Sequence, residues 1–206
     1  MAKKIDVETT QVHELLYQSL ETELGGVQVY ETALRCAVNE DLAKEWTKYH
    51  EETQRHVEIM TRVCESLGLD TATMTPGREV VRFQGEALVR SMEMALEAGD
   101  PAAAELVACE CVVLAETKDH SNWELIGKVA EKMADGDAAK VLRQAYEAVE
   151  QEEDHHIYHT KGWCRELWLQ SLGLPAVVPP PEEVKNVETA IGASRAEQAR
   201  DQMRPQ

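Results

Sequence analysis

The sequence predicts an all-α protein, an antiparallel four-helix bundle with a long crossover between its second and third helices. Two observations predict this class. Ala, Leu, Glu and Gln dominate the 206 residues, whereas runs of β-branched residues, which favour strands, are nearly absent. Apolar residues also recur at steps of three and four through four long segments, which is the spacing of one buried helix face.

The first two long segments predict a helical hairpin. We expect one helix from about residue 7 to residue 36, and a second that continues to about residue 67, where Gly68 supplies a C-terminal cap. The link between them, residues 38–41, is so short that the two helices must be antiparallel neighbours.

A long crossover follows the first hairpin. Residues 69–82 contain Thr-Pro-Gly and are expected to be loop, and residues 85–98 are expected to form a short extra helix. Asp100 and Pro101 then combine an N-cap residue with proline at the first helical position, which is a strong start signal.

The third and fourth helices of the bundle form the second hairpin. The third is expected to run to about residue 133, and Asp135-Gly136-Asp137 interrupts the helical pattern after it. The fourth is expected to end near residue 172. We therefore assign residues 1–173 to the bundle and residues 174–206, which contain three consecutive prolines, to an extended or partly disordered tail.

Composition excludes several classes of function. The net charge of −17 should repel nucleic acids and anionic membranes and attract cations. No apolar stretch approaches the roughly 20 residues that a membrane span requires. The five cysteines are an odd number, and their spacing is not that of a disulfide framework. The first residues lack the apolar core of a secretory signal. We therefore expect a reduced, cytoplasmic protein.

Six polar residues lie at seam positions, the inward-facing positions of the helices, where the bundle needs apolar side chains. Buried carboxylates that converge cannot all be charged without a neutralising cation, and carboxylates with imidazoles in a helix bundle suit a pair of metal ions. The number of residues between each of the six and the nearest interhelical turn gives its position along the bundle axis. These positions agree within about two helical turns. The predicted ligands are Glu23, Glu52, His56, Glu116, Glu152 and His156.

The two halves of the chain repeat this pattern. An aromatic residue follows Glu23 and Glu116 after seven positions, and Glu52 precedes His56 by four, as Glu152 precedes His156. The repeat indicates a bundle with approximate two-fold symmetry and one set of ligands for each of two metals. Oxygen-rich sets with two imidazoles favour iron or manganese over structural zinc.

Three further residues are candidates for the site. His120 lies one turn after Glu116 and is either an extra ligand or the partner of one, and His159 is expected to be the partner of a ligand. Glu153 competes with Glu152, because it precedes His156 by three residues. We expect the aromatic residues of the repeat, Tyr30 and Trp123, to pack in the core.

Over about residues 10–170 the chain resembles a known family. The runs from His50 to Glu58 and from Gln151 to His156 resemble the second- and fourth-helix segments of YciE/YciF-type bacterial ferritin-like proteins. The resemblance implies a ferritin-like bundle with two Fe or Mn ions and the six ligands named above. The four-residue spacing from Glu to His departs from the three-residue spacing of ferritins and rubrerythrins, and no Cys-x-x-Cys pair supplies a rubredoxin-type centre.

These observations predict a dimetal-carboxylate oxidoreductase. It would react with dioxygen or hydrogen peroxide as a ferroxidase, a peroxidase or a catalase-like stress enzyme, and we expect a homodimer or a larger homo-oligomer. The alternative is a non-enzymatic, stress-associated assembly protein whose metal site mainly holds the bundle together.

Overall fold

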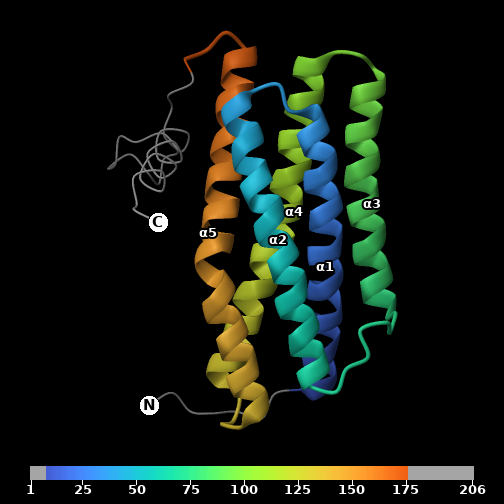
Figure 1. Ribbon diagram of the computed structural model, residues 1–206, viewed down its shortest axis with the longest axis vertical. Helices are drawn as coiled ribbons and strands as arrows, with labels where there is room; N and C mark the ends of the chain where they lie inside the picture. The colour runs from blue at the N-terminus through green and yellow to red at the C-terminus, as the bar shows by residue number, and fades with distance from the viewer. Residues whose placement is uncertain (1–7, 176–206) are drawn as a thin grey trace.

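The computed structural model describes residues 8–175, and within this range the chain forms five helices and no strand. The all-α prediction is therefore confirmed. The predicted tail falls, from residue 176 on, outside the described residues. The helices are α1 (Thr9–Cys36), α2 (Glu40–Ser66), α3 (Pro76–Glu97), α4 (Pro101–Lys132) and α5 (Asp137–Ser171), shown in Figure 1.

Short polar residues begin α2 and α4, and the cap at Asp100 was predicted. The Asn39 side chain accepts hydrogen bonds from two backbone N–H groups at the start of α2, and Asp100 does the same for α4. Gly68, with a φ of 72°, follows α2 in the left-handed conformation that a helix end requires. Local sequence signals therefore account for both ends of α2 and for the start of α4.

The crossover helix is longer than predicted. It begins at Pro76, inside the segment expected to be loop, and covers 22 residues rather than a few turns. The Thr75 side chain accepts a hydrogen bond from the backbone N–H of Arg78, so Thr-Pro-Gly is a helix start rather than a turn. The prediction of a loop was wrong here because a turn and a helix start favour the same residues.

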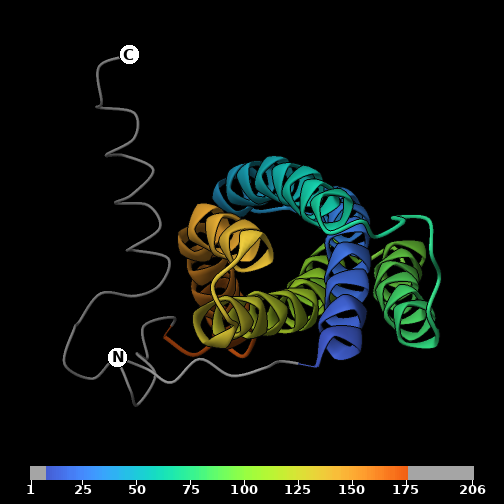
Figure 2. The same ribbon diagram turned by 90° about the horizontal axis from the view of Figure 1, so that it is seen from below.

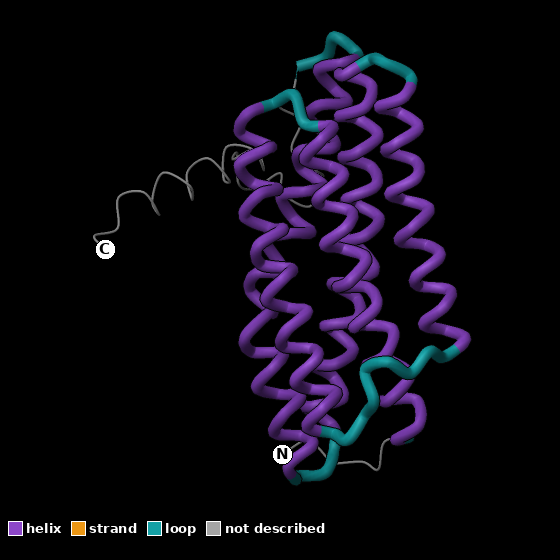
Figure 3. The backbone as a smooth tube through the Cα atoms, turned by 45° about the vertical axis from the view of Figure 1, so that its right-hand side comes forward, coloured by secondary structure: helices purple, strands orange, loops and turns teal. Residues whose placement is uncertain are grey.

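Four helices enclose a common interior, and α3 lies outside them. Packing contacts join α1 to α2 and α4, and α5 to α2 and α4, so these four form a closed ring (Figure 2). Helix α3 packs mainly against α1 and α4, and it carries the chain back along the length of the molecule (Figure 3). As a result, α2 and α4 run in the same direction and the ring neighbours are antiparallel.

The interior contains two apolar clusters with a polar layer between them. Along α1, one cluster includes buried residues from Val12 to Leu20 and the other includes residues from Val29 to Cys36. The turns of the ring helices between the clusters carry the buried Glu and His residues. Among the described residues, no helix is both long and apolar enough to cross a membrane.

Candidate metal centre

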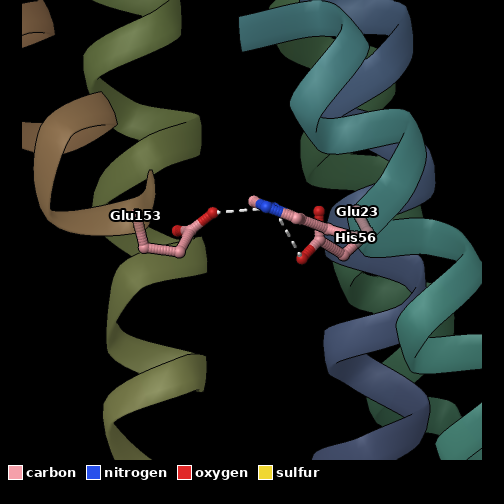
Figure 4. Close-up of side chains that lie close together, drawn as sticks. All are labelled: Glu23, His56 and Glu153. Atoms are coloured by element: carbon pink, nitrogen blue, oxygen red, sulfur yellow. Dashed lines mark ion pairs between the residues drawn. The ribbon is translucent and has the colours of Figure 1, made fainter. Parts of the chain in front are cut away.

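The polar layer brings together five Glu and His residues from all four ring helices. None is more than 3% exposed, because each lies on the inward face of its helix. Within residues 8–175 they form two groups in which the ligand atoms lie within 4.8 Å of one another. The first group is Glu23, His56 and Glu153 (Figure 4), and the second is Glu116, Glu153 and His156.

The spacing of these atoms suits metal coordination. His56 Nδ1 lies 3.1 Å from Glu153 Oε1 and 3.7 Å from Glu23 Oε1. His156 Nδ1 lies 3.5 Å from Glu116 Oε2 and 3.7 Å from Glu153 Oε1. Two ligand atoms about 2.1 Å from one ion, at roughly a right angle, are about 3 Å apart. Each group could therefore hold a metal ion, and Glu153 belongs to both groups.

Each of the five residues also keeps one buried atom that has no hydrogen-bond partner. Such atoms are rare in folded proteins because each one costs free energy of desolvation. Here they gather in one layer, which is the arrangement expected of residues that bind a cation. The atoms are Glu23 Oε2, His56 Nδ1, Glu116 Oε2, Glu153 Oε2 and His156 Nδ1.

Two further carboxylates orient the histidine rings. Glu152 Oε2 lies 2.8 Å from His56 Nε2, and Glu52 Oε2 lies 2.9 Å from His156 Nε2, so each half of the chain supports the histidine of the other. A proton held on Nε2 leaves the lone pair of Nδ1 free to face an ion. We predicted Glu52 and Glu152 as ligands, and the structure places both beside the Nε2 atoms of the histidines, outside the two groups.

The choice between Glu152 and Glu153 follows from helix geometry. One residue along a helix turns the side chain by about 100° around the axis. Glu153 therefore points inward, with 2% of its side chain exposed, whereas the Glu152 side chain lies at the rim and is 32% exposed. Glu153 is the acid shared by both groups.

Tyr30 and Trp123 do more than pack in the core. Both are 1% exposed, as expected of core residues. The Trp123 indole N–H donates to Glu23 Oε1 at 2.7 Å, and the Tyr30 hydroxyl donates to Glu116 Oε1 at 2.7 Å. Each aromatic residue thus fixes the carboxylate of the opposite half and leaves its second oxygen free.

The electrostatics of the metal-free cluster favour bound protons. Burial raises the pKa of Glu23 well above its usual value, and the carboxylates of Asp119 and Glu153 raise it further. Burial alone would lower the pKa of His156, but the carboxylates around it, Glu116 foremost, raise it to about 10. Divalent ions can take the place of these protons.

The other two histidine candidates lie outside both groups. His120 is partly exposed, and its Nε2 lies 2.9 Å from Asp154 Oδ1. His159 is buried, with Nδ1 2.8 Å from the Tyr49 hydroxyl and 2.9 Å from Glu45 Oε1. The Tyr49 ring in turn packs against His156, with 4.1 Å between ring centroids. His159 therefore lies behind a residue that contacts a candidate ligand.

One acidic residue of the layer was not predicted. Asp119 of α4 is 4% exposed, its carboxylate raises the pKa of Glu23, and its Oδ1 has no hydrogen-bond partner. The signal for it was its position three residues after Glu116, on the same face of the helix.

Comparisons with known proteins identify no relative. No family model matches the chain, and neither curated proteins nor solved structures give a significant match. The ferritin-like family stays a prediction from the sequence, and the case for a function rests on the geometry of the polar layer.

Proposed function

We propose that the chain is a ferritin-like dimetal-carboxylate redox protein that holds two iron or two manganese ions and reacts with dioxygen or hydrogen peroxide. The observation that carries this proposal is the convergence, from four helices, of five buried ligand atoms that have no hydrogen-bond partner. Three carboxylates with two imidazoles form an oxygen-rich set that suits iron or manganese. Placing such a set inside a helix bundle is a known solution for dimetal sites.

The ligands divide between the two positions by proximity. Glu23 and His56 serve one ion, Glu116 and His156 serve the other, and Glu153 is shared. These residues supply three negative charges toward the four positive charges of two divalent ions. When bound, the metal pair supplies the electrons for reducing dioxygen or peroxide.

The surrounding residues hold the ligands in place. The His56 hydrogen bond and the nearby Arg55 guanidinium lower the pKa of Glu152 to about 2, although burial opposes them. Glu152 therefore stays charged and accepts a hydrogen bond from His56. Tyr30 holds the carboxylate of Glu116 in its orientation, and Trp123 does the same for Glu23. The apolar clusters on both sides of the layer keep bulk water away.

Metal stoichiometry of matched variants tests the proposal. Metal-free protein is loaded with Fe(II) or Mn(II), desalted and measured by mass spectrometry of the metal content. We expect two ions per chain in the wild type and loss of both in Glu153→Gln, because Glu153 belongs to both groups. Glu150→Gln removes an exposed acid of the same helix and should keep two ions.

Redox assays then separate the enzyme from a protein that only holds metal. Uptake of dioxygen with Fe(II), or release of dioxygen from hydrogen peroxide with Mn(II), is expected in the wild type and not in Glu153→Gln. A wild-type protein that binds no metal, or a Glu153→Gln variant that retains both ions at the same affinity, would contradict the assignment.

A further inference from the structure

The two halves of the metal centre differ at one ligand position. Glu153 precedes His156 by three residues, and the residue in the same place before His56 is Thr53. The Thr53 hydroxyl donates to the Tyr49 carbonyl of its own helix at 2.9 Å. Helix α2 therefore provides no counterpart to the Glu153 carboxylate at this place, and its buried Glu52 lies beside His156 of the other half instead.

Asp119 adds a carboxylate to the half that contains His56, from another helix. It follows Glu116 by three residues, and the corresponding residue after Glu23 is Gly26. A Cβ atom on Gly26 would lie 3.1 Å from Thr53 Cγ2, so these two small residues fill the space on their side of the layer. The repeat thus pairs Gly26 and Thr53 in one half with Asp119 and Glu153 in the other.

The surroundings of Asp119 point to a cation. Only 4% of Asp119 is exposed, and its Oδ1 has no hydrogen-bond partner. Its carboxylate is also close enough to Glu23 to raise the pKa of that residue. The neighbouring ammonium of Lys118 is bound to Asn122 Oδ1 instead. Two buried carboxylates that repel each other are unfavourable unless a proton or a metal ion neutralises them.

We propose that Asp119 is a metal ligand of the ion held by Glu23 and His56, and that it replaces the carboxylate which Thr53 does not supply. This inference rests on the proposed dimetal function. It makes the two positions unequal, because one has Glu23, His56 and Asp119 and the other has Glu116 and His156, with Glu153 between them. The position with the additional carboxylate should fill first.

Titration of metal-free protein with Mn(II), followed by calorimetry and by the electron paramagnetic resonance of bound manganese, tests this assignment. We expect two distinguishable binding steps in the wild type. Asp119→Asn keeps the shape of the side chain and should weaken one step by about 10- to 100-fold or more. Adding Thr53→Glu to Asp119→Asn should restore most of that affinity, because it returns a carboxylate to the same half.

Glu105→Gln is the matched control. Glu105 is also a buried acid of α4, but it accepts hydrogen bonds from the backbone N–H groups of Val38 and Asn39. Its substitution should leave both binding steps and the manganese spectrum unchanged. Circular dichroism verifies folding, and Asp119→Asn should be no less stable than the metal-free wild type because it removes a buried charge.

The possible results separate the two proposals. If the wild type binds two ions and Asp119→Asn binds both with unchanged affinity and spectrum, Asp119 is not a ligand although the metal centre stands. A loss of affinity that a folded Asp119→Asn/Thr53→Glu variant does not recover also overturns the ligand role. If the wild type binds neither Mn(II) nor Fe(II), the proposed function fails, and this inference fails with it.

Discussion

At the scale of single residues, Glu152 and Glu153 show how much one position changes the chemistry of an acid. Glu152 lies at the rim with His56 and the Arg55 guanidinium, and these partners lower its pKa to about 2. Glu153 lies inside, and burial raises its pKa. Glu152 therefore serves as a permanent hydrogen-bond acceptor, whereas Glu153 needs a cation, a proton or a histidine to offset its charge.

Metal binding is expected to release protons. Because the pKa of His156 is raised to about 10 in the metal-free protein, its ring binds a proton at neutral pH, and an ion must displace that proton. Affinity should therefore rise with pH, by up to about tenfold per pH unit for each proton displaced. Calorimetry between about pH 6 and 8, in buffers with different protonation enthalpies, measures this release. An affinity independent of pH would contradict it.

At the scale of the helices, α3 is attached differently from the other four. Its few buried residues are Arg78, Val81 and Met92, so it lacks the continuous apolar seam of the ring helices. Arg78 Nε donates to Glu21 Oε2 at 2.7 Å, and both residues are buried. The backbones approach closely at Gly25 and Gly85, where an added Cβ would lie within 4 Å of the opposite Cα. An ion pair and a glycine contact therefore dock α3 on α1.

Glu21→Gln should loosen α3 without affecting the metal centre. It leaves the buried Arg78 guanidinium without its counter-charge, and breaking a buried pair in this way costs about 3–5 kcal/mol. Urea denaturation and hydrogen exchange of the α3 amides measure the effect. Glu97→Gln, which removes an exposed partner of Arg90, should change stability by less than about 1 kcal/mol. Equal stability of the two variants would contradict the docking role.

The same pair should make the docking of α3 sensitive to acid. The two arginines lower the pKa of Glu21 below its ordinary value of 4.5, although burial acts in the opposite direction. A lowered pKa means that the contribution is present above pH 4.5 and is lost as the pH falls through the folded-state value. The Glu21→Gln variant should lack this part of the acid dependence.

At the scale of the whole molecule, the polar layer lies where the four ring helices meet. The apolar clusters on either side stabilise the bundle, whereas the buried acids between them oppose folding when no cation is present. A metal pair would therefore connect all four helices through the least stable part of the interior.

Metal is expected to stabilise the entire bundle. A ligand present at about 1,000 times its dissociation constant adds roughly 4 kcal/mol to the free energy of unfolding, which corresponds to a Tm increase of about 8–16 °C for a chain of this size. Differential scanning calorimetry with Mn(II), and again with excess chelator, measures this shift. Glu153→Gln should show little of it, and an unchanged Tm in the wild type would contradict a site that spans the bundle.

Much of the molecule could be predicted from the sequence because the signals are local. The apolar period and the caps at Asn39 and Asp100 define the long helices without reference to tertiary contacts. The polar residues at inward positions indicated the layer, and the structure buries Glu23, Glu116, His56 and His156 there. The exception was Thr-Pro-Gly at the start of α3, where one short motif fits either a turn or a helix start.

The rotation of each helix about its axis was decided only by tertiary packing. Because neighbouring residues on a helix differ by about 100° in direction, a small rotation determines whether Glu152 or Glu153 faces inward, and whether His120 or Asp119 does. The period of apolar residues is too coarse to fix that angle. Contacts across the bundle fix it, such as the bonds from Tyr30 to Glu116 and from Trp123 to Glu23. The sequence by itself determined that acids and histidines meet in one layer, and the packing of the helices decided which of their atoms face one another.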